Sequence, residues 1–107
     1  TLARSTKPRT GHYAATKGGV LGLMRVMALE TAKEGIRVNA ISPGIADTPM
    51  PNAVYESGTM ADRAAANPMG RIGTANDMAQ TALFLLSDDA SYVTGQDIRV
   101  NGGQDPF

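Results

Sequence analysis

The chain has 107 residues, and its ten Lys or Arg side chains are balanced by ten Asp or Glu, so the formal net charge is zero. This length allows at most one hydrophobic core, and the lack of a basic stretch or of a long apolar run argues against nucleic acid or membrane as the main partner. Cysteine is absent, which excludes a disulfide scaffold and a thiolate metal site; we expect no metal, and a reducing compartment such as the cytoplasm.

After a loop-like start rich in Arg, Lys, Ser, Thr and Pro, the sequence predicts one long helix. Thr10 is a suitable N-cap and Gly35 a suitable C′ residue, and no proline lies between Thr10 and Glu34. A helix that is apolar all round is buried on more than one side, so we expect one face to pack on a sheet and another on a second subunit. The apolar residues on its several faces are Val20, Leu21, Leu23, Met24, Val26, Met27 and Leu29.

A short β-rich run, Ile36 to Ser42, follows this helix and is ended by the Pro43–Gly44 dipeptide, so it reads as a strand. Residues 47–67 are rich in Pro, Asn, Gly, Ala and Met and show weak periodicity. We expect a long binding loop or lid there, with short helical pieces. Its apolar residues are candidates for a substrate lid, or equally for packing or subunit contacts: Met50, Val54, Tyr55 and Met60.

The last third of the chain predicts a second helix and a second strand. Thr74 and Asp77 have the spacing of a capping box and open a helix that runs through Leu86. The sequence then predicts a strand over residues 96–100, which the glycines at 102–103 end. The apolar stripe expected on the helix comprises Met78, Ala79, Ala82, Leu83 and Leu86.

The order helix, strand, long loop, helix, strand is half of an open α/β sheet with helical crossovers. Two parallel strands do not make a complete sheet with both faces covered, so we expect the other half to lie upstream in a longer protein.

Tyr13 and Lys17 are the first candidates for chemistry. At i and i+4 on a helix, their side chains project from one face and can approach each other. A phenol has a pKa of about 10 and is a poor base at neutral pH, but an adjacent ammonium favours the phenolate and lowers that pKa. The neighbouring Gly18 and Gly19 leave the helix surface bare for a flat ligand. By itself, however, this spacing also arises by accident in many helices.

The stretch NAISPGIADTPM, residues 39–50, is the second candidate. A strand that ends in Pro43–Gly44 leaves backbone N–H groups open at the carboxyl edge of the sheet, where ligands of open α/β proteins bind. Thr48 is placed to offer a hydroxyl to an amide or a phosphate. Taken alone, the stretch is equally an ordinary turn after a strand.

Together these stretches resemble the short-chain dehydrogenase/reductase family through essentially the whole chain. Residues 13–17 resemble its Tyr-x-x-x-Lys motif, and RVNAISPGIADTPM its Pro-Gly segment after a strand. GRIGTANDMAQTALFLLSDDASYVTGQDIRVNGG is similar to its last helix, last strand and Gly-Gly end, with Asn101 in place of the usual Asp. The resemblance implies that residues 1–107 are the C-terminal half of a doubly wound, parallel-sheet Rossmann domain.

The resemblance also implies roles in an enzyme that uses NAD or NADP. Tyr13 would be the catalytic acid/base, and Lys17 would lower its pKa and bind the nicotinamide ribose hydroxyls. The Pro43–Gly44 turn would run beside the nicotinamide. The backbone of Ala46 would bond the carboxamide, and the Thr48 hydroxyl would reach the carboxamide or the pyrophosphate.

The spacing of the pair narrows the implied reaction. Enoyl reductases of the family separate Tyr and Lys by a longer interval, so a spacing of four favours the couple of a secondary alcohol and a ketone over C=C reduction. His12, next to Tyr13, could face the substrate, although a histidine beside a loop is more often solvated. The helix that is apolar all round suggests a homodimer or homotetramer.

Two parts that the family requires are not in these 107 residues. Its catalytic serine would fall just before Thr1, since Ser5 is too close to Tyr13, and its glycine-rich phosphate-binding turn would lie further upstream. We therefore expect the 107 residues alone to be inactive. Two alternatives stay open: a catalytically inactive relative that serves as a binding or scaffold protein, and an isolated helical interaction domain.

Overall fold

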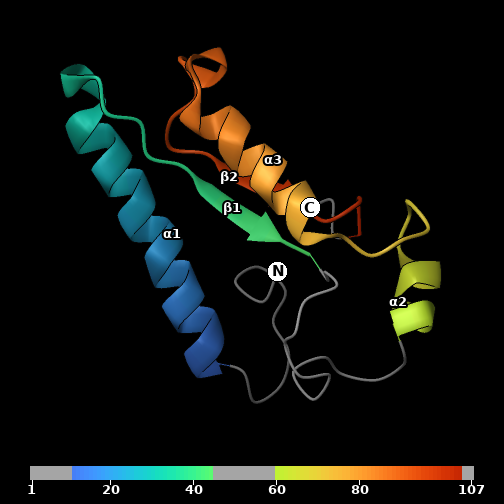
Figure 1. Ribbon diagram of the computed structural model, residues 1–107. Coiled ribbons are helices and arrows are strands. Elements are labelled where there is room, and N and C mark those ends of the chain that lie inside the picture. The colour runs from blue at the N-terminus through green and yellow to red at the C-terminus, as the bar shows by residue number, and fades with distance from the viewer. Residues whose placement is uncertain (1–10, 45–59, 105–107) are drawn as a thin grey trace.

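A computed structural model describes residues 11–44 and 60–104 (Figure 1). The predicted loop at residues 1–10 and most of the predicted lid lie outside the described residues. The described elements are α1 (Gly11–Thr31), the 3₁₀ turn η1 (Ala32–Glu34), β1 (Ala40–Pro43), α2 (Met60–Ala66), α3 (Ala75–Leu86), the 3₁₀ turn η3 (Asp88–Ala90) and β2 (Asp97–Val100). Within these ranges the order of helices and strands is the one that the sequence predicted, and α2 is one of the short helical pieces expected in the long segment.

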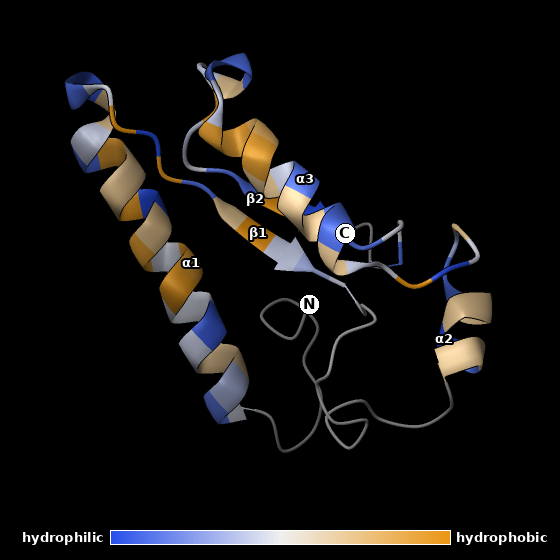
Figure 2. Ribbon diagram, viewed as in Figure 1, coloured by the Kyte–Doolittle hydropathy of each residue, from blue (hydrophilic) through white to orange (hydrophobic). Residues whose placement is uncertain are grey.

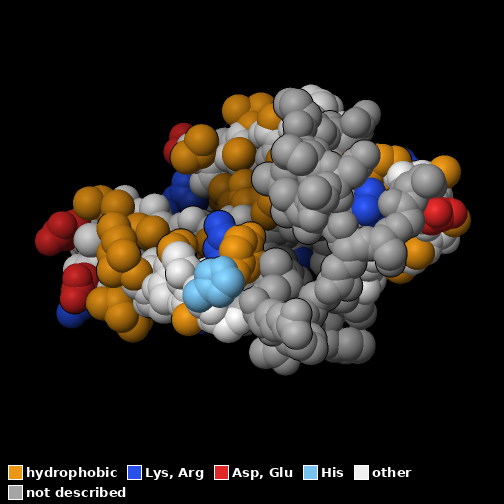
Figure 3. Space-filling model, turned by 90° about the horizontal axis from the view of Figure 1, so that it is seen from below, with side chains coloured by type: hydrophobic (Ala, Val, Ile, Leu, Met, Phe, Trp, Pro, Cys, Tyr) orange, Lys and Arg blue, Asp and Glu red, His pale blue; other side chains and the backbone are white. Residues whose placement is uncertain are grey.

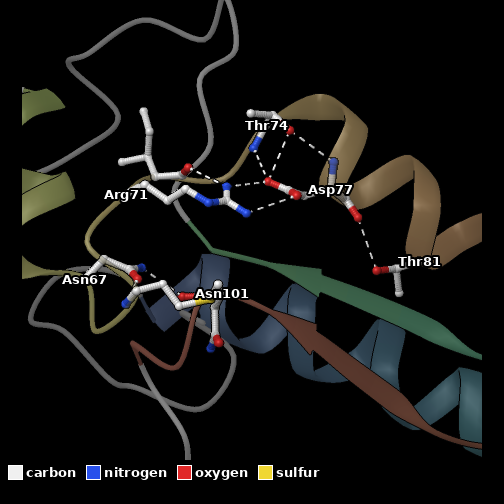
Figure 4. Close-up of polar contacts among 8 residues, drawn as sticks. Asn67, Arg71, Thr74, Asp77, Thr81 and Asn101 are labelled. Carbon is white, nitrogen blue, oxygen red and sulfur yellow. Dashed lines mark hydrogen bonds and ion pairs between the residues drawn. The ribbon is translucent and has the colours of Figure 1, made fainter.

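The two strands form a parallel pair, with Ala40 opposite Asp97 and Pro43 opposite Val100. α1 lies on one side of this pair and α3 on the other (Figures 1 and 4). A parallel pair with helices on both faces is part of an α/β sheet with crossovers. The predicted architecture, part of a parallel α/β sheet with helical crossovers, is therefore confirmed.

The first strand begins at Ala40, four residues later than the sequence predicted. The extended residues before it bond to the loop that precedes β2 instead of to the ladder. The Val38 N–H donates to the Thr94 hydroxyl at 3.0 Å, and the Gly95 N–H donates to the Val38 carbonyl at 2.8 Å. The β-rich composition of residues 36–39 thus reflects extended backbone that pairs with a loop.

The long helix α1 ends at Thr31, three residues before the predicted end at Glu34, and those three residues form the 3₁₀ turn η1, a common way for a helix to end. Gly35, the predicted C′ residue, follows η1 in a left-handed conformation with φ 78°. Only one face of α1 is buried, through Leu21, Met24 and Ala28. Ala28 packs closely against Gly95, since a Cβ added to that glycine would lie 3.5 Å from the Ala28 Cβ. The other apolar faces of α1 are exposed in the described part of the chain. Figure 2 shows hydrophobic residues in successive turns of this helix.

α3 begins with the predicted capping box. The Thr74 hydroxyl accepts a hydrogen bond from the Asp77 N–H at 3.1 Å, and the Asp77 carboxylate accepts one from the Thr74 N–H at 2.8 Å. The predicted apolar stripe was partly wrong, because Leu83 and Leu86 are exposed and Leu85 is buried. Leu85 shares the inner face with Met78, Thr81 and Ala82, at i, i+3, i+4 and i+7 spacing. The position of the sheet decides which face of α3 is the inner one.

No helix within residues 11–44 and 60–104 combines the length and the apolar character that crossing a membrane requires.

Candidate functional site

The site expected from the sequence lies at the carboxyl edge of the strand pair. Both strands point toward this edge, and the N-terminal ends of α1 and α3 lie on the same side of the molecule (Figure 1). The first turn of α1, the Pro43–Gly44 turn after β1 and the glycine turn after β2 therefore all lie at this edge of the sheet. Ligands of open α/β sheets bind at this edge.

The structure brings Tyr13 and Lys17 together, as their spacing predicted. The Lys17 Nζ lies 5.5 Å from the centroid of the Tyr13 ring, within the range of a cation–π contact. The Tyr13 side chain is 43% exposed, so a ligand can reach it. One helical turn therefore presents a phenol and an ammonium side by side.

The helix surface next to this pair is bare. A Cβ added to Gly18 or to Gly19 would meet no atom of the described chain within 4 Å. His12 is exposed in the same first turn, where its backbone carbonyl accepts a hydrogen bond from the Thr16 hydroxyl at 2.8 Å. The expected contact of His12 with a substrate stays a prediction. Figure 3 shows this side of the molecule, with hydrophobic side chains gathered over α1 at the left of the view.

The Pro43–Gly44 turn is held against the end of β2. The Gly44 N–H donates to the Val100 carbonyl at 2.9 Å, which continues the strand pairing by one residue. A Cβ on Gly44 would lie 2.8 Å from the Cβ of Asn101, closer than real Cβ contacts come. Glycine is thus required here by the backbone that crosses it, a reason that the sequence did not reveal.

Other predicted site residues are not placed by the structure. Ala46 and Thr48, expected to bind the cofactor, lie outside the described residues, as do Ser5, Met50, Val54 and Tyr55. Met60 is described as the first residue of α2, where its sulfur lies 3.8 Å from Nη1 of Arg63.

Sequence reasoning missed Asn67, which is 8% exposed just after α2. Its carboxamide donates through Nδ2 to the Asn101 carbonyl at 3.0 Å and accepts from the Met69 N–H at 2.9 Å (Figure 4). The available signal was an Asn-Pro pair directly after a short helix, a sequence typical of turns. Nothing in that pair names Asn101, 34 residues away, as its partner.

Arg71 and Asp77 form a second polar pair at the same edge. Arg71 Nη1 lies 2.8 Å from Asp77 Oδ2, and Nη2 lies 3.3 Å from Oδ1, so the contact is bidentate. The hydrogen bond from Arg71, together with the one from the Thr74 N–H, holds the pKa of the Asp77 carboxyl well below its usual range. The pair ties the loop after α2 to the start of α3.

A cleft of about 270 Å³ lies between the loop after α2, the inner face of α3 and the end of β2. It is lined by Asn67, Met69, Arg71, Gly73, Asp77, Met78, Thr81, Val100, Asn101 and Gly102. Its polar residues form two hydrogen-bonded groups, Asn67 with Asn101, and Asp77 with Arg71 and Thr81, as Figure 4 shows. Within the described ranges, no cluster of three His, Asp or Glu side chains is arranged to hold a metal ion.

Comparison with known sequences places this architecture among oxidoreductases. A family model described as enoyl-(acyl carrier protein) reductase matches residues 1–105. The 3-oxoacyl-(acyl-carrier-protein) reductase FabG of Thermotoga maritima is 45% identical over 98 residues, which cover 90% of this chain and 39% of that protein. The glucose and ribitol dehydrogenase homolog of Oryza sativa is 44% identical over 91 residues, or 85% of this chain and 30% of that protein.

Solved structures agree with the sequence comparison. A short-chain type dehydrogenase/reductase from Mycobacterium ulcerans superposes with a TM-score of 0.83 at 42% identity, covering 96% of this chain and 38% of that one. The protein ElxO, whose structure holds NADP, superposes with a TM-score of 0.81 at 30% identity over 98% of this chain and 43% of its own. The chain thus spans less than half the length of these relatives.

Proposed function

Because the chain belongs to the short-chain dehydrogenase/reductase family, we propose that it is the catalytic-helix part of an NAD(P)-dependent oxidoreductase. The proposed reaction interconverts a secondary alcohol and a ketone by hydride transfer. The observation that carries this proposal is the Tyr13–Lys17 pair, which is exposed on one helical turn beside a bare glycine surface.

Tyr13 is the proposed acid/base. In reduction, its phenol donates a proton to the carbonyl oxygen of the substrate; in oxidation, its phenolate accepts the proton of the alcohol. A nicotinamide cofactor, when bound, would supply the hydride to the carbonyl carbon in reduction or accept it from the alcohol carbon in oxidation. The Lys17 ammonium stabilises the phenolate, since an adjacent positive charge favours the ionised form of a phenol.

The described residues fit the nicotinamide end of such a cofactor. Gly18 and Gly19 leave the surface beside the pair unobstructed, and Lys17 offers N–H donors for ribose hydroxyls. The Pro43–Gly44 turn is the proposed neighbour of the nicotinamide, with the Ala46 backbone and the Thr48 hydroxyl as its proposed partners. The choice between NAD and NADP stays open, because the proposal assigns no residue to the adenosine end.

Two classes of substrate are possible for such an enzyme: compounds reduced at a C=O bond and compounds reduced at a C=C bond. The four-residue interval between Tyr13 and Lys17 favours C=O reduction, and relatives such as FabG bear the name of 3-oxoacyl reductases. The family model, in contrast, bears the name of an enoyl reductase, which acts on C=C. We propose the C=O couple, because the interval is a property of this chain and the model's name covers a broad family.

An assay of the full-length protein tests this proposal. It is offered 3-oxoacyl and 2-enoyl thioesters, and a panel of simple ketones and secondary alcohols, with NADH, NADPH or their oxidised forms, and nicotinamide absorbance is followed. We expect turnover with a carbonyl or alcohol substrate and none with the enoyl thioester. Turnover of the enoyl thioester alone would assign C=C reduction. Cofactor binding without turnover of any compound would favour the inactive scaffold instead.

We also propose that a second copy of the protein covers the apolar faces of α1 that the described chain leaves open. Five of its apolar side chains are 44–81% exposed: Val20, Leu23, Val26, Met27 and Leu29. A helix with this much open apolar surface packs well against a symmetry-related helix. The competing occupant is another part of the same longer protein.

Substitution on α1 distinguishes the two occupants. In the full-length protein, Leu23→Lys with Leu29→Lys is expected to lower the sedimenting mass while circular dichroism stays unchanged. Tyr92→Lys, at a fully exposed residue outside α1, is the control and should leave the mass unchanged. If the double variant loses its helical signal at unchanged association state, the face is covered within one chain.

A further inference from the structure

We propose that Asn67 is a positioning residue, whose buried carboxamide holds the turn after β2 and, through that turn, the Pro43–Gly44 turn beside the cofactor. This inference rests on the proposed function, which places the nicotinamide at the Pro43–Gly44 turn. It concerns a residue that follows α2 and whose role in the reaction is indirect.

The carboxamide of Asn67 is fixed at both ends. Its Oδ1 accepts from the Met69 N–H at 2.9 Å, which closes a tight local turn and orients the group. This orientation directs Nδ2 toward the Asn101 carbonyl, to which it donates at 3.0 Å. The side chain is only 8% exposed, so water cannot readily replace either bond.

The turn after β2, to which Asn67 is hydrogen-bonded, has two residues with positive φ angles. Gly102 and Gly103 have φ values of 63° and 86°, so the chain reverses there in a conformation that only glycine adopts easily. A Cβ on Gly102 would overlap the Asn67 carboxamide, so the two residues are in close contact. The Asn101 side chain accepts from the Gly103 N–H at 3.0 Å and completes the turn.

On its other side, the same turn supports Gly44. Asn101 lies so close that a Cβ on Gly44 would be 2.8 Å from the Asn101 Cβ and 2.9 Å from its Cα. The Gly44 N–H is bonded to the Val100 carbonyl at 2.9 Å. Asn101 therefore lies between Asn67 and Gly44, and a shift of the chain at Asn101 would reach Gly44 through the bonded carbonyl of the adjacent Val100.

The rate of the proposed reaction depends on how closely the reacting groups keep their positions. A misplacement of about 1 Å between a reacting group and its partner can cost on the order of 100-fold in rate. The contact joins residues 34 positions apart, and neither Asn67 nor Asn101 belongs to the buried apolar core of the described chain, which comprises Leu21, Met24, Ala28, Leu85 and Ala90. Loss of the Asn67 bond should thus loosen the turn beside the nicotinamide more than it destabilises the fold.

The test uses Asn67→Asp in the full-length protein. This variant keeps the size and the Met69 bond but replaces the Nδ2 donor with an acceptor that faces the Asn101 carbonyl. We expect KM and Kd for the nicotinamide cofactor to rise by roughly tenfold, with a smaller change in KM for the carbonyl substrate. Asn76→Asp is the matched control, because Asn76 is exposed in the first turn of α3, and its cofactor constants should match wild type.

Further arms keep the inference falsifiable. If Asn67→Asp does not fold, Asn67→Ser retains a shorter donor and should raise the cofactor KM by a smaller factor. A lower melting temperature with unchanged cofactor KM and Kd per folded molecule, in whichever of these variants folds, would show a merely structural role and overturn the inference. If instead the wild-type protein turns over no carbonyl or alcohol compound with either cofactor, it is the proposed function that fails. Loss of turnover in Tyr13→Phe with wild-type cofactor constants in Asn67→Asp would refute the positioning role alone.

Discussion

The Tyr13–Lys17 pair and the polar cluster behind it are built in opposite ways. The pair stands on an open helical face, where its two side chains are related by one helical turn and Tyr13 is 43% exposed. The cluster of Asn67, Asn101, Arg71 and Asp77 is cross-linked by hydrogen bonds between loops and element ends (Figure 4). In the proposed enzyme, the residues assigned to the reaction are thus accessible, and the residues that hold the adjoining turns lie apart from them.

Tyr13→Phe in the full-length protein should show the largest effect, because it removes the proton donor and little else. General acid–base catalysis contributes about 10²- to 10⁴-fold to the rate, so kcat should fall by a factor of about 10² or more. The melting temperature and the cofactor Kd should stay near wild type, since the Tyr13 ring remains. Turnover by nicotinamide absorbance, thermal unfolding and cofactor titration check the three expectations.

Tyr92→Phe is the matched control for this change, because the Tyr92 side chain is fully exposed and lies in the loop before β2. It should leave turnover unchanged. Near wild-type turnover in Tyr13→Phe would remove the acid/base role of Tyr13 and assign the proton transfer to another group of the protein.

Lys17→Ala should differ from Tyr13→Phe in one respect. The proposed ammonium acts on both the phenolate and the ribose, so its removal should lower kcat and raise the cofactor Kd, each by about tenfold or more. A fall in kcat with an unchanged Kd would limit Lys17 to the phenolate. Cofactor titration beside steady-state kinetics separates the two outcomes.

The reactive pair could be predicted from the sequence, because its geometry is local. Tyr13 and Lys17 lie four residues apart on a helix, and once the helix is predicted their proximity follows. The capping box of Thr74 and Asp77 is local in the same sense. The parallel pairing of the strands also followed from the order of elements.

The supporting cluster could not be predicted, because its contacts depend on tertiary structure. Asn67 meets a residue 34 positions away, and Gly44 is required by Asn101 rather than by its own backbone angles. The buried face of α3 was misjudged for the same reason: Leu83, Leu85 and Leu86 are all apolar, and only the position of the sheet selects Leu85.

Gly44→Ala tests the tightness of this cluster, and its effect should be smaller than that of Tyr13→Phe on turnover but larger on stability. The added Cβ would lie 2.8 Å from the Asn101 Cβ and 2.9 Å from the Cα, and backbone cannot move aside cheaply. Overpacking of this kind costs about 1–3 kcal/mol, which urea unfolding of the full-length protein would detect.

The control for this prediction is Gly22→Ala, in the interior of α1, where an added Cβ meets no described atom within 4 Å. Alanine is favoured over glycine in a helix by about 0.5–1 kcal/mol, so this variant should be as stable as wild type or more stable. Equal stability of the two alanine variants would show that the turn after β1 is free to move and would remove the contrast between pair and cluster.

Asp77 gives the smallest predicted effect, confined to stability at acid pH. Its pKa is lowered in the folded protein by the hydrogen bonds from Arg71 and from the Thr74 N–H, while in the unfolded chain it stays near 4. The folded state then binds fewer protons than the unfolded state in this range. The stability that the carboxylate contributes is therefore complete above about pH 5 and is lost progressively as the pH falls below that value.

Asp77→Asn keeps the size of the side chain and abolishes its titration, so it isolates this contribution from that of the other carboxylates. We expect the melting temperature of wild type to exceed that of Asp77→Asn at pH 6 and the difference to shrink steadily as the pH is lowered from about 5 to 3. Asp89→Asn, at an exposed residue of η3, should follow the wild-type curve. Because Arg71 and Asp77 are at the surface, salt should narrow the difference at pH 6. A constant difference across the whole pH range would mean that the Asp77 contacts act through shape alone, and that the loop after α2 is anchored to α3 without help from charge.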